Sequence, residues 1–599
     1  MNLLVQAGFF LPYIAHMHKN RYQKIRLLLT TCMLSTMASV LQAQQTVFEL
    51  SQGRETATYE ELISFYQNLD QAHDILEMRE LGPTDAGYPL HVLLLSNDRN
   101  FNLASWHAEG KLVVLINNGI HPGEPDGIDA SMILARDICL GKKRLPDNLA
   151  LAIVPVYNIG GCLNRNAYTR VNQQGPAAYG FRGNAQNLDL NRDFSKCDSR
   201  EAASFTRLFH SLDPDIFIDT HVSDGADFQH VMTLISTQYD KLGEPAGSWM
   251  RDVYEPMLYE GMRKKGHAMI PYIDFGATDL KKGWKMFEDA PRYSSGYAAL
   301  YGTFSFMPET HMLKPYTQRV KATIDLLDVF LESASEKADL IIDIRKRWKE
   351  KISRQYQFAI QWKRDSSRHR MMEFMGYESD SMISKATGLK RMYYDHGRAY
   401  TQMIRYYDGF QPAKVVEKPK AYIIPRGWPD VLDRLHWNGV RIDTLTRDSL
   451  IRLGVYHIAD YQSSTMPYEK HFRHRSVTLM RSEETLMCKK GDYIIYTNQS
   501  SNNYIIQMLE PEAEDSYFRW NFFDAILQRK EGYSDYRWDE LAAEVLASDS
   551  ALAKAVADRK KADPEFARNH SAILYYIYKF SKYFEPAYRR YPVYRLERE

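Results

Sequence analysis

Two near-continuous apolar runs constrain the fold more than any other feature of this sequence. Residues 111–118 (KLVVLINN) and 149–158 (LALAIVPVYN) lack the polar alternation of a half-exposed strand, so they indicate strands that are buried on both faces. Residues 126–140, between them, have the apolar spacing of a helix. Strands that alternate with helices in this way form a mostly parallel sheet with helices packed on it. The sequence therefore predicts a layered α/β domain.

The same alternation continues on both sides of these runs. Thr58, followed by Glu61 three positions later, is the signature of a helix start and opens the helical pattern at 58–76. We expect the α/β domain to extend over about 46–335. Further strands are predicted at 89–96, 215–220 and 302–309, and further helices at 199–213, 249–266 and 316–335.

The pattern changes after residue 335. Residues 336–418 are charged and rich in Tyr and Arg without the strand–helix alternation, and are assigned to a connecting region. Residues 419–599 are predicted to form a C-terminal module that is first β-rich and then helical. Its strands are expected at 419–428 and in HRSVTLMRS, GDYIIYTN and NYIIQML of 473–508, and its helices in 536–599.

Composition excludes one class of partner. Lys and Arg total 76 and Asp and Glu total 75, a balance that gives no field to attract nucleic acid. The length indicates roughly two to four domains. Aromatic residues make up 13% of the chain, and we expect them mainly to fill hydrophobic cores.

The N-terminal region has the order of a secretory signal peptide. The basic stretch KNRYQKIR precedes a mostly apolar run, and Ala43 follows as the small residue at the cleavage site. We therefore expect 1–43 to be removed, with Met17 as the natural start, and the mature protein to be secreted or periplasmic. The two threonines before Cys32 are a poor context for lipid attachment. No other stretch approaches the length of a membrane span, so none is expected in the mature chain.

Four cysteines follow the predicted cleavage site. None has the CxxC spacing of a thiolate zinc site, and a domain of this size does not need disulfides, although an oxidising compartment would permit them. We expect free thiols at Cys139, Cys162, Cys197 and Cys488.

Two predicted strand ends carry residues that can bind zinc. The HPGE motif of His121 and Glu124 follows the strand at 111–118, and His221 follows the strand at 215–220. Ligands bind at the carboxyl ends of parallel strands, where side chains from different strands meet. A catalytic zinc takes three protein ligands and leaves a position for water. These three residues therefore form a candidate site, although each motif alone also fits an ordinary loop.

Two further motifs supply a carboxylate-binding pair and a base. In NLDLNRDF, Asn191 and Arg192 offer an amide and a planar guanidinium to a carboxylate. Asp189 could accept the outer N–H of a zinc-bound histidine. Glu309 ends an apolar strand, where a carboxylate beside a zinc-bound water can act as general base.

In this order and on these elements, the four motifs resemble those of the zinc carboxypeptidase family (the M14 metallopeptidases). The resemblance covers about 58–335. It implies a three-layer domain with a mixed, mostly parallel sheet, and one Zn²⁺ per chain. It also implies zinc ligation by His121, Glu124 and His221, support of the first histidine by Asp189, binding of the substrate's terminal carboxylate by Asn191 and Arg192, and base catalysis by Glu309.

Two family roles have more than one candidate in this sequence. The arginine that polarises the scissile carbonyl is matched by Arg182, with Arg170 and Arg165 as alternatives. The mobile tyrosine is matched by Tyr293 in RYSSGY, with Tyr297 as the alternative. This loop is shorter than in digestive members of the family, so the side-chain preference is not carried over.

The resemblance implies a secreted metallocarboxypeptidase whose substrate is a peptide with a free C-terminal carboxylate. One alternative is the same zinc chemistry on cell-wall peptides or N-acyl amino acids. Others are a non-catalytic peptide- or glycan-binding protein on this fold, and a carbohydrate-active protein that works through its aromatic second half. For the second half itself, restricting access to the cleft, binding cell-wall or glycan material, and stabilising the fold all stay open.

Overall fold

The computed structural model describes residues 45–273 and 280–598. The predicted signal peptide, with Cys32, lies outside the described residues. No helix in the described ranges is long and apolar enough to cross a membrane. The prediction of free thiols is confirmed, since Cys139, Cys162, Cys197 and Cys488 are all unpaired.

The α/β domain is built on a nine-stranded mixed sheet. Its centre is parallel: β4 (Leu149–Val154) pairs with β3 (Leu112–Asn117), β3 with β5 (Ile216–Asp219), and β5 with β10 (Phe304–His311). All residues of these four strands are buried, as their apolar runs predict. The remaining strands are β1 (Leu76–Pro83), β2 (Pro89–Leu95), β6 (His221–Ser223), β7 (Met232–Ser236) and β8 (Ile270–Pro271).

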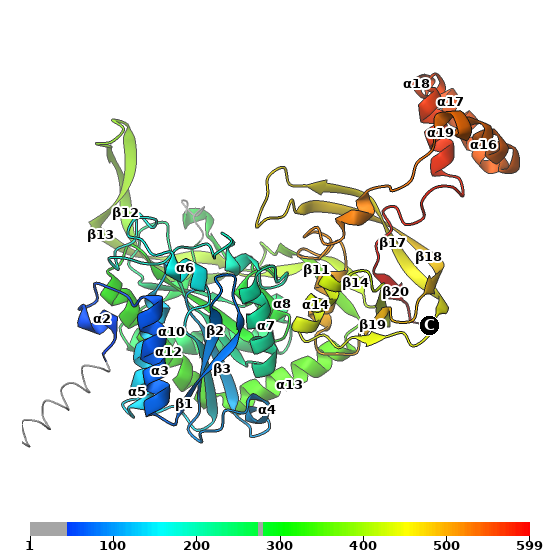
Figure 1. Cartoon of the computed structure of the whole chain (residues 1–599). Coiled ribbons are helices and arrows are strands. Elements are labelled where there is room, and N and C mark those ends of the chain that lie inside the picture. The colour runs from blue at the N-terminus through cyan, green and yellow to red at the C-terminus, as the bar shows by residue number, and fades with distance from the viewer. Residues whose placement is uncertain (1–44, 274–279, 599) are drawn as a thin grey trace, which may run out of the picture.

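Helices cover both faces of the sheet (Figure 1). On one side α3 (Tyr59–Ala72), α5 (Asp126–Cys139) and α12 (Tyr316–Glu336) pack together, while α7 (Arg200–Leu212) packs on β1 and β2 from the other side. Also in this domain is α10 (Glu255–Lys264), which packs on α12. The predicted three-layer α/β domain with a mixed, mostly parallel sheet is confirmed.

The start of α3 follows the predicted capping pattern. Thr58 N–H donates to the Glu61 carboxylate over 2.8 Å, and Glu61 N–H donates to the Thr58 hydroxyl over 3.3 Å. The helix ends at Ala72 rather than at the predicted residue 76. The reason is tertiary, because Leu76 begins β1 and pairs with Leu95 on β2.

The region predicted as a connecting segment begins as part of the α/β domain. Its first helix, α13 (Ala338–Arg354), carries Arg345 to the amino ends of β5 and β10. The Arg345 guanidinium lies 2.6 Å from the Asp215 carboxylate and donates to the Gly302 carbonyl over 3.1 Å. One continuous cluster of buried hydrophobic residues extends from Ala57 to Val593, so the two halves of the chain share a core.

Two long hairpins project from the second half (Figure 1). The first is formed by β12 (Arg370–Ile383) and β13 (Lys390–Tyr407), and the second by β17 (Ser449–Ser463) and β18 (His474–Cys488). Residues 464–473, which join β17 to β18, are called the hairpin loop below.

The C-terminal module contains a six-stranded sheet to which β17 and β18 belong. The expectation of a strand at NYIIQML was wrong, because these residues lie in helix α15 (Asn502–Leu509). The helix is buried almost all round, and a short run without a polar face has no periodicity that distinguishes a helix from a strand. The helical end is confirmed, and comprises α16 (Asp535–Ser548), α17 (Ser550–Ala562), α18 (Pro564–Ala567) and α19 (His570–Lys579).

Candidate metal centre

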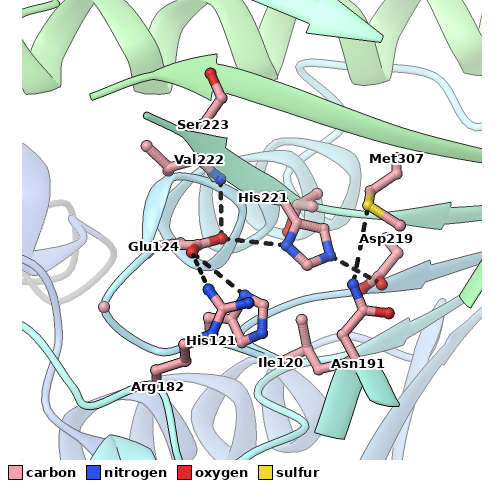
Figure 2. Close-up of polar contacts among 12 residues, drawn as sticks. Ile120, His121, Glu124, Arg182, Asn191, Asp219, His221, Val222, Ser223 and Met307 are labelled. Carbon is pink, nitrogen blue, oxygen red and sulfur yellow. Dashed lines mark hydrogen bonds and ion pairs between the residues drawn. The ribbon is translucent and has the colours of Figure 1, made fainter. Parts of the chain in front are cut away.

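His121, Glu124 and His221 meet at the carboxyl ends of two neighbouring parallel strands. His121 and Glu124 lie in the loop after β3, and β6 begins at His221, one residue after β5. Asn117 at the end of β3 is the register partner of Asp219 at the end of β5. The three side chains are buried, and their ligand atoms lie within 4.8 Å of one another (Figure 2). The structure thus brings together the three residues predicted to hold zinc.

Gly123 of the HPGE loop packs closely against two neighbouring segments. The backbone N–H of Glu124 donates to the His121 carbonyl over 2.8 Å. A Cβ on Gly123 would lie 2.7 Å from Cδ of Arg170 and 2.9 Å from the Gly180 carbonyl oxygen. Glycine at this position therefore allows Arg170 to approach the site closely.

Each histidine is oriented by a carboxylate on its outer nitrogen. Nε2 of His121 lies 3.0 Å from Asp189, and Nε2 of His221 lies 3.0 Å from Asp219. Both Nδ1 atoms face Glu124, at 3.2 Å from His121 and 3.1 Å from His221. Nδ1 of His121 is buried without a hydrogen-bond partner among the described residues. Two imidazoles with their outer nitrogens already paired, and one shared carboxylate, form a donor set that fits one Zn²⁺.

Glu124 is surrounded by positive charge. It accepts hydrogen bonds from Arg170 over 2.9 Å and from the Val222 backbone N–H over 2.9 Å. Burial opposes its ionisation, but the charges of His121 and Arg170 outweigh burial and hold the pKa of this carboxyl well below its usual value. Glu124 is therefore in the ionised form that a metal ion requires.

Glu309 lies beside this cluster. On β10 it is the register partner of His221 on parallel β6 and of Thr233 on antiparallel β7. Burial raises the pKa of Glu309 to about 7, an effect that His221 opposes and Glu124 reinforces. A carboxyl that titrates near neutral pH can both accept and return a proton.

A cavity of about 310 Å³ lies over the cluster and is also lined by Glu309, Asn191, Arg192 and Tyr293. The Arg192 guanidinium donates to the Asn191 carbonyl over 2.8 Å and lies 4.6 Å from the centre of the Tyr293 ring. The alternative tyrosine, Tyr297, is fully buried outside the cavity lining and donates to Asn438 over 2.7 Å. The structure thus places the predicted carboxylate-binding pair and Tyr293 on the cavity wall.

Two of the three candidate arginines also reach this cavity. Arg182 and Arg170 line it, and their guanidinium groups lie 3.5 and 2.9 Å from Glu124. Arg165 instead donates to the backbone carbonyl of Thr56 over 2.8 Å. Arg182 also donates to the Asp189 carboxylate over 2.9 Å.

The sequence reasoning gave no role to Asp219. The sequence does contain an indication of a role for Asp219. An acidic residue two positions before a histidine, at the end of the same strand, can reach the outer nitrogen of that histidine. No sequence pattern indicates the apolar residues of the cavity wall, because they come from separate segments that only folding brings together. They are Ile235, Tyr272, Phe287, Met307 and Met312.

Comparison with known proteins agrees with this geometry. Residues 62–212 match the family model of the zinc carboxypeptidases. The chain is 21% identical over 439 residues to carboxypeptidase 2 of Trichophyton rubrum, which covers 68% of this chain and 73% of that protein. It is 21% identical over 435 residues to carboxypeptidase 2 of Trichophyton tonsurans, with 68% and 73% covered. A solved metallo-carboxypeptidase from Burkholderia cenocepacia is 18% identical, with 47% of this chain and 70% of that chain covered and a TM-score of 0.35. Over residues 62–212 the chain is thus similar to the zinc carboxypeptidase family.

Proposed function

We propose that this protein is a zinc-dependent metallocarboxypeptidase that removes C-terminal residues from peptides. The proposal is carried by the shared cavity, in which Asn191 and Arg192 lie on the wall of the space that also contains the His121, Glu124 and His221 side chains. A guanidinium and an amide together can bind a carboxylate. A peptide held there by its terminal carboxylate has its last peptide bond near the metal cluster.

Glu309 is the proposed general base. Zn²⁺ held by His121, Glu124 and His221 would supply a Lewis acid and acidify a water molecule. Glu309 accepts the proton of the attacking water, because its carboxyl lines the cavity beside His121, Glu124 and His221. The same carboxyl then returns the proton to the leaving amine, so that the residue ends the cycle as it began.

Arg182 is the proposed partner of the scissile carbonyl. Arg170 donates to Glu124 over 2.9 Å and to Gln173 over 2.7 Å, whereas Arg182 donates to Asp189 over 2.9 Å and lies 3.5 Å from Glu124. The side chain of Arg182 is 45% exposed, compared with 14% for Arg170, so more of it is accessible from solvent. A cation in that position can stabilise the negative charge that develops on the carbonyl oxygen.

Digestion of a peptide library by the zinc-loaded protein, read by mass spectrometry, tests the proposal. We expect loss of single C-terminal residues, and resistance of the same peptides when the C-terminus is an amide. Cleavage confined to muropeptides or N-acyl amino acids would favour the alternative zinc amidase. Zinc binding without hydrolysis of any of these substrates would contradict a catalytic role.

We also propose that the protein acts outside the cytoplasm. The support is the order of basic, apolar and small residues in 1–43. N-terminal sequencing of the mature protein from fractionated cells tests this. A first residue at Gln44 is expected, and an uncleaved cytoplasmic chain would contradict the proposal.

A further inference from the structure

The carboxylate-binding side of the cavity is held by a loop that is distant in sequence. The backbone N–H of Asp189 donates to the Glu469 carboxylate over 2.8 Å. At the other end of the same segment, the Asp198 carboxylate lies 2.7 Å from Nε2 of His471. Two residues of the hairpin loop therefore hold both ends of the segment that contains Asn191 and Arg192.

Asp189 is the residue around which this segment is arranged. Its carboxylate accepts the Asn191 backbone N–H over 2.9 Å and a hydrogen bond from Arg182 over 2.9 Å. Its carbonyl accepts the Arg192 backbone N–H over 3.0 Å. Because Glu469 binds the backbone N–H of Asp189, it holds the peptide group directly before the carbonyl and carboxylate that make these other contacts.

Tyr468, the neighbour of Glu469, lies next to Arg192. Burial raises the pKa of the Tyr468 phenol, and the charge of the Arg192 guanidinium opposes this rise. The Tyr468 ring in turn stacks on Trp520, with centroids 6.0 Å apart and planes 19° apart. Arg192 therefore has a tyrosine neighbour from each half of the chain.

The hairpin loop adopts a specific turn that directs these side chains. Glu469 and Lys470 have φ values of 49° and 59°, in the left-handed region that non-glycine residues rarely occupy. The turn is closed by backbone hydrogen bonds in both directions between Tyr468 and His471, at 2.9 and 3.1 Å. Such a conformation costs free energy and persists only where surrounding contacts impose it. Here those contacts include the ones with Asp189.

A second contact from the C-terminal half supports the other side of the site. Asp515 accepts the backbone N–H of Arg292 over 2.9 Å and pairs with its guanidinium at 2.9 Å. Arg292 directly precedes Tyr293 in the sequence. The residues around Arg192 are thus fixed from the C-terminal half at two points, whereas all three predicted metal ligands come from the first half.

We propose that the hairpin loop positions the carboxylate-binding side of the substrate site. Glu469 is a positioning residue that acts through Asp189 on Arg192. This inference rests on the proposed carboxypeptidase function. It assigns to part of the second half a role in recognising the end of the peptide, separate from holding the metal.

Kinetics of the full-length, zinc-loaded protein test the inference. Glu469→Ala removes the acceptor for the Asp189 N–H, whereas Glu469→Gln keeps an amide oxygen there. We expect Glu469→Ala to raise KM for peptides with a free carboxylate about tenfold, with a small change in kcat, because one charge-assisted hydrogen bond is lost. Glu469→Gln should stay close to wild type, and zinc content should be unchanged in both. Glu483→Ala, on an exposed part of β18, is the matched control.

The outcomes separate the inference from the proposed function. An unchanged KM in Glu469→Ala, with active wild-type enzyme, would overturn the inference alone. Equal damage in Glu469→Ala and Glu469→Gln with loss of zinc would also overturn it, since the loop would then only stabilise the fold. Failure of the wild type to hydrolyse any peptide would contradict the proposed function. Calorimetric binding of a substituted succinate, weaker in Glu469→Ala than in wild type, would still support the carboxylate-positioning role in that case.

Discussion

Glu309 and His221 are register partners on the adjacent parallel strands β10 and β6. The pairing fixes their backbones side by side, so the Glu309 carboxyl shares the cavity with the metal cluster without belonging to it. A general base needs this position, because a carboxylate bound to the metal would lose the basicity that proton transfer requires.

Glu309→Gln should abolish turnover while leaving zinc bound. The amide has nearly the same shape but cannot accept a proton, so we expect kcat to fall by about 10²–10⁴. Metal content by atomic absorption and kcat on a free-carboxylate peptide measure the two effects. Glu373→Gln, at an exposed position on β12, serves as control and should behave as wild type. Retention of most of the activity in Glu309→Gln would show that another group is the base.

Removing the metal should destabilise the protein. We expect zinc to bind only the folded arrangement of His121, Glu124 and His221. A ligand whose free concentration is a thousandfold above its Kd stabilises the folded state by about 4 kcal/mol. Calorimetry should show a lower Tm after chelation and recovery when zinc is restored. His221→Ala should lose this dependence, whereas His267→Ala, which removes a partner of Asp325 on α12, should keep it. An unchanged Tm of the wild-type protein after chelation would contradict a zinc site here.

Replacing Arg192 should affect recognition of the peptide end more than catalysis. Loss of a hydrogen bond to a charged group costs about 1.5–3 kcal/mol, so Arg192→Ala should raise KM for free-carboxylate peptides about tenfold to hundredfold. Arg192→Lys should be intermediate, because it keeps the charge without the planar fork. Comparing each peptide with its C-terminal amide measures the effect, and the exposed Arg200→Ala is the control. An equal effect of Arg192→Ala on the free-carboxylate peptide and on its C-terminal amide would contradict a carboxylate-binding role.

The sequence contained enough to predict the α/β domain because its signals are local. The runs that form β3 and β4 are buried on both faces, and the predicted ligands His121 and His221 lie a few residues after strands whose carboxyl ends share one edge of the sheet. The apolar pattern of each strand and the metal-binding residue types after it lie within a few residues of each other. Local sequence is therefore enough to predict both the strands and the candidate site.

The rest depends on contacts between distant segments. Glu469 lies 280 positions after Asp189, and nothing in the sequence around either residue indicates their hydrogen bond. The sequence predicts a strand in place of the helix that begins at Asn502, because burial on almost all sides removes the polar face that would reveal the helical period. Tertiary environment, which local pattern does not contain, determined both features.

His230 joins the first hairpin of the second half to the α/β domain. Nδ1 of His230 lies 2.9 Å from the Ala268 carbonyl, and Nε2 accepts the backbone N–H of Met375 on β12 over 3.1 Å. A ring nitrogen that accepts a hydrogen bond carries no proton, so this pair of contacts requires the neutral imidazole. Burial lowers the pKa of His230 to about 4.

Acid should therefore weaken the fold through His230. Above about pH 6.5 the residue is neutral whether the chain is folded or unfolded, and it makes no contribution that depends on pH. Between about pH 6.5 and pH 4 only the unfolded chain takes up the proton, so stability falls with pH by up to about 3 kcal/mol. Urea unfolding at a series of pH values measures this fall. His230→Asn, which keeps a donor for Ala268 but does not titrate, should flatten the curve in this window, whereas the exposed His570→Asn should leave it unchanged. Parallel curves for wild type and His230→Asn would contradict the assignment.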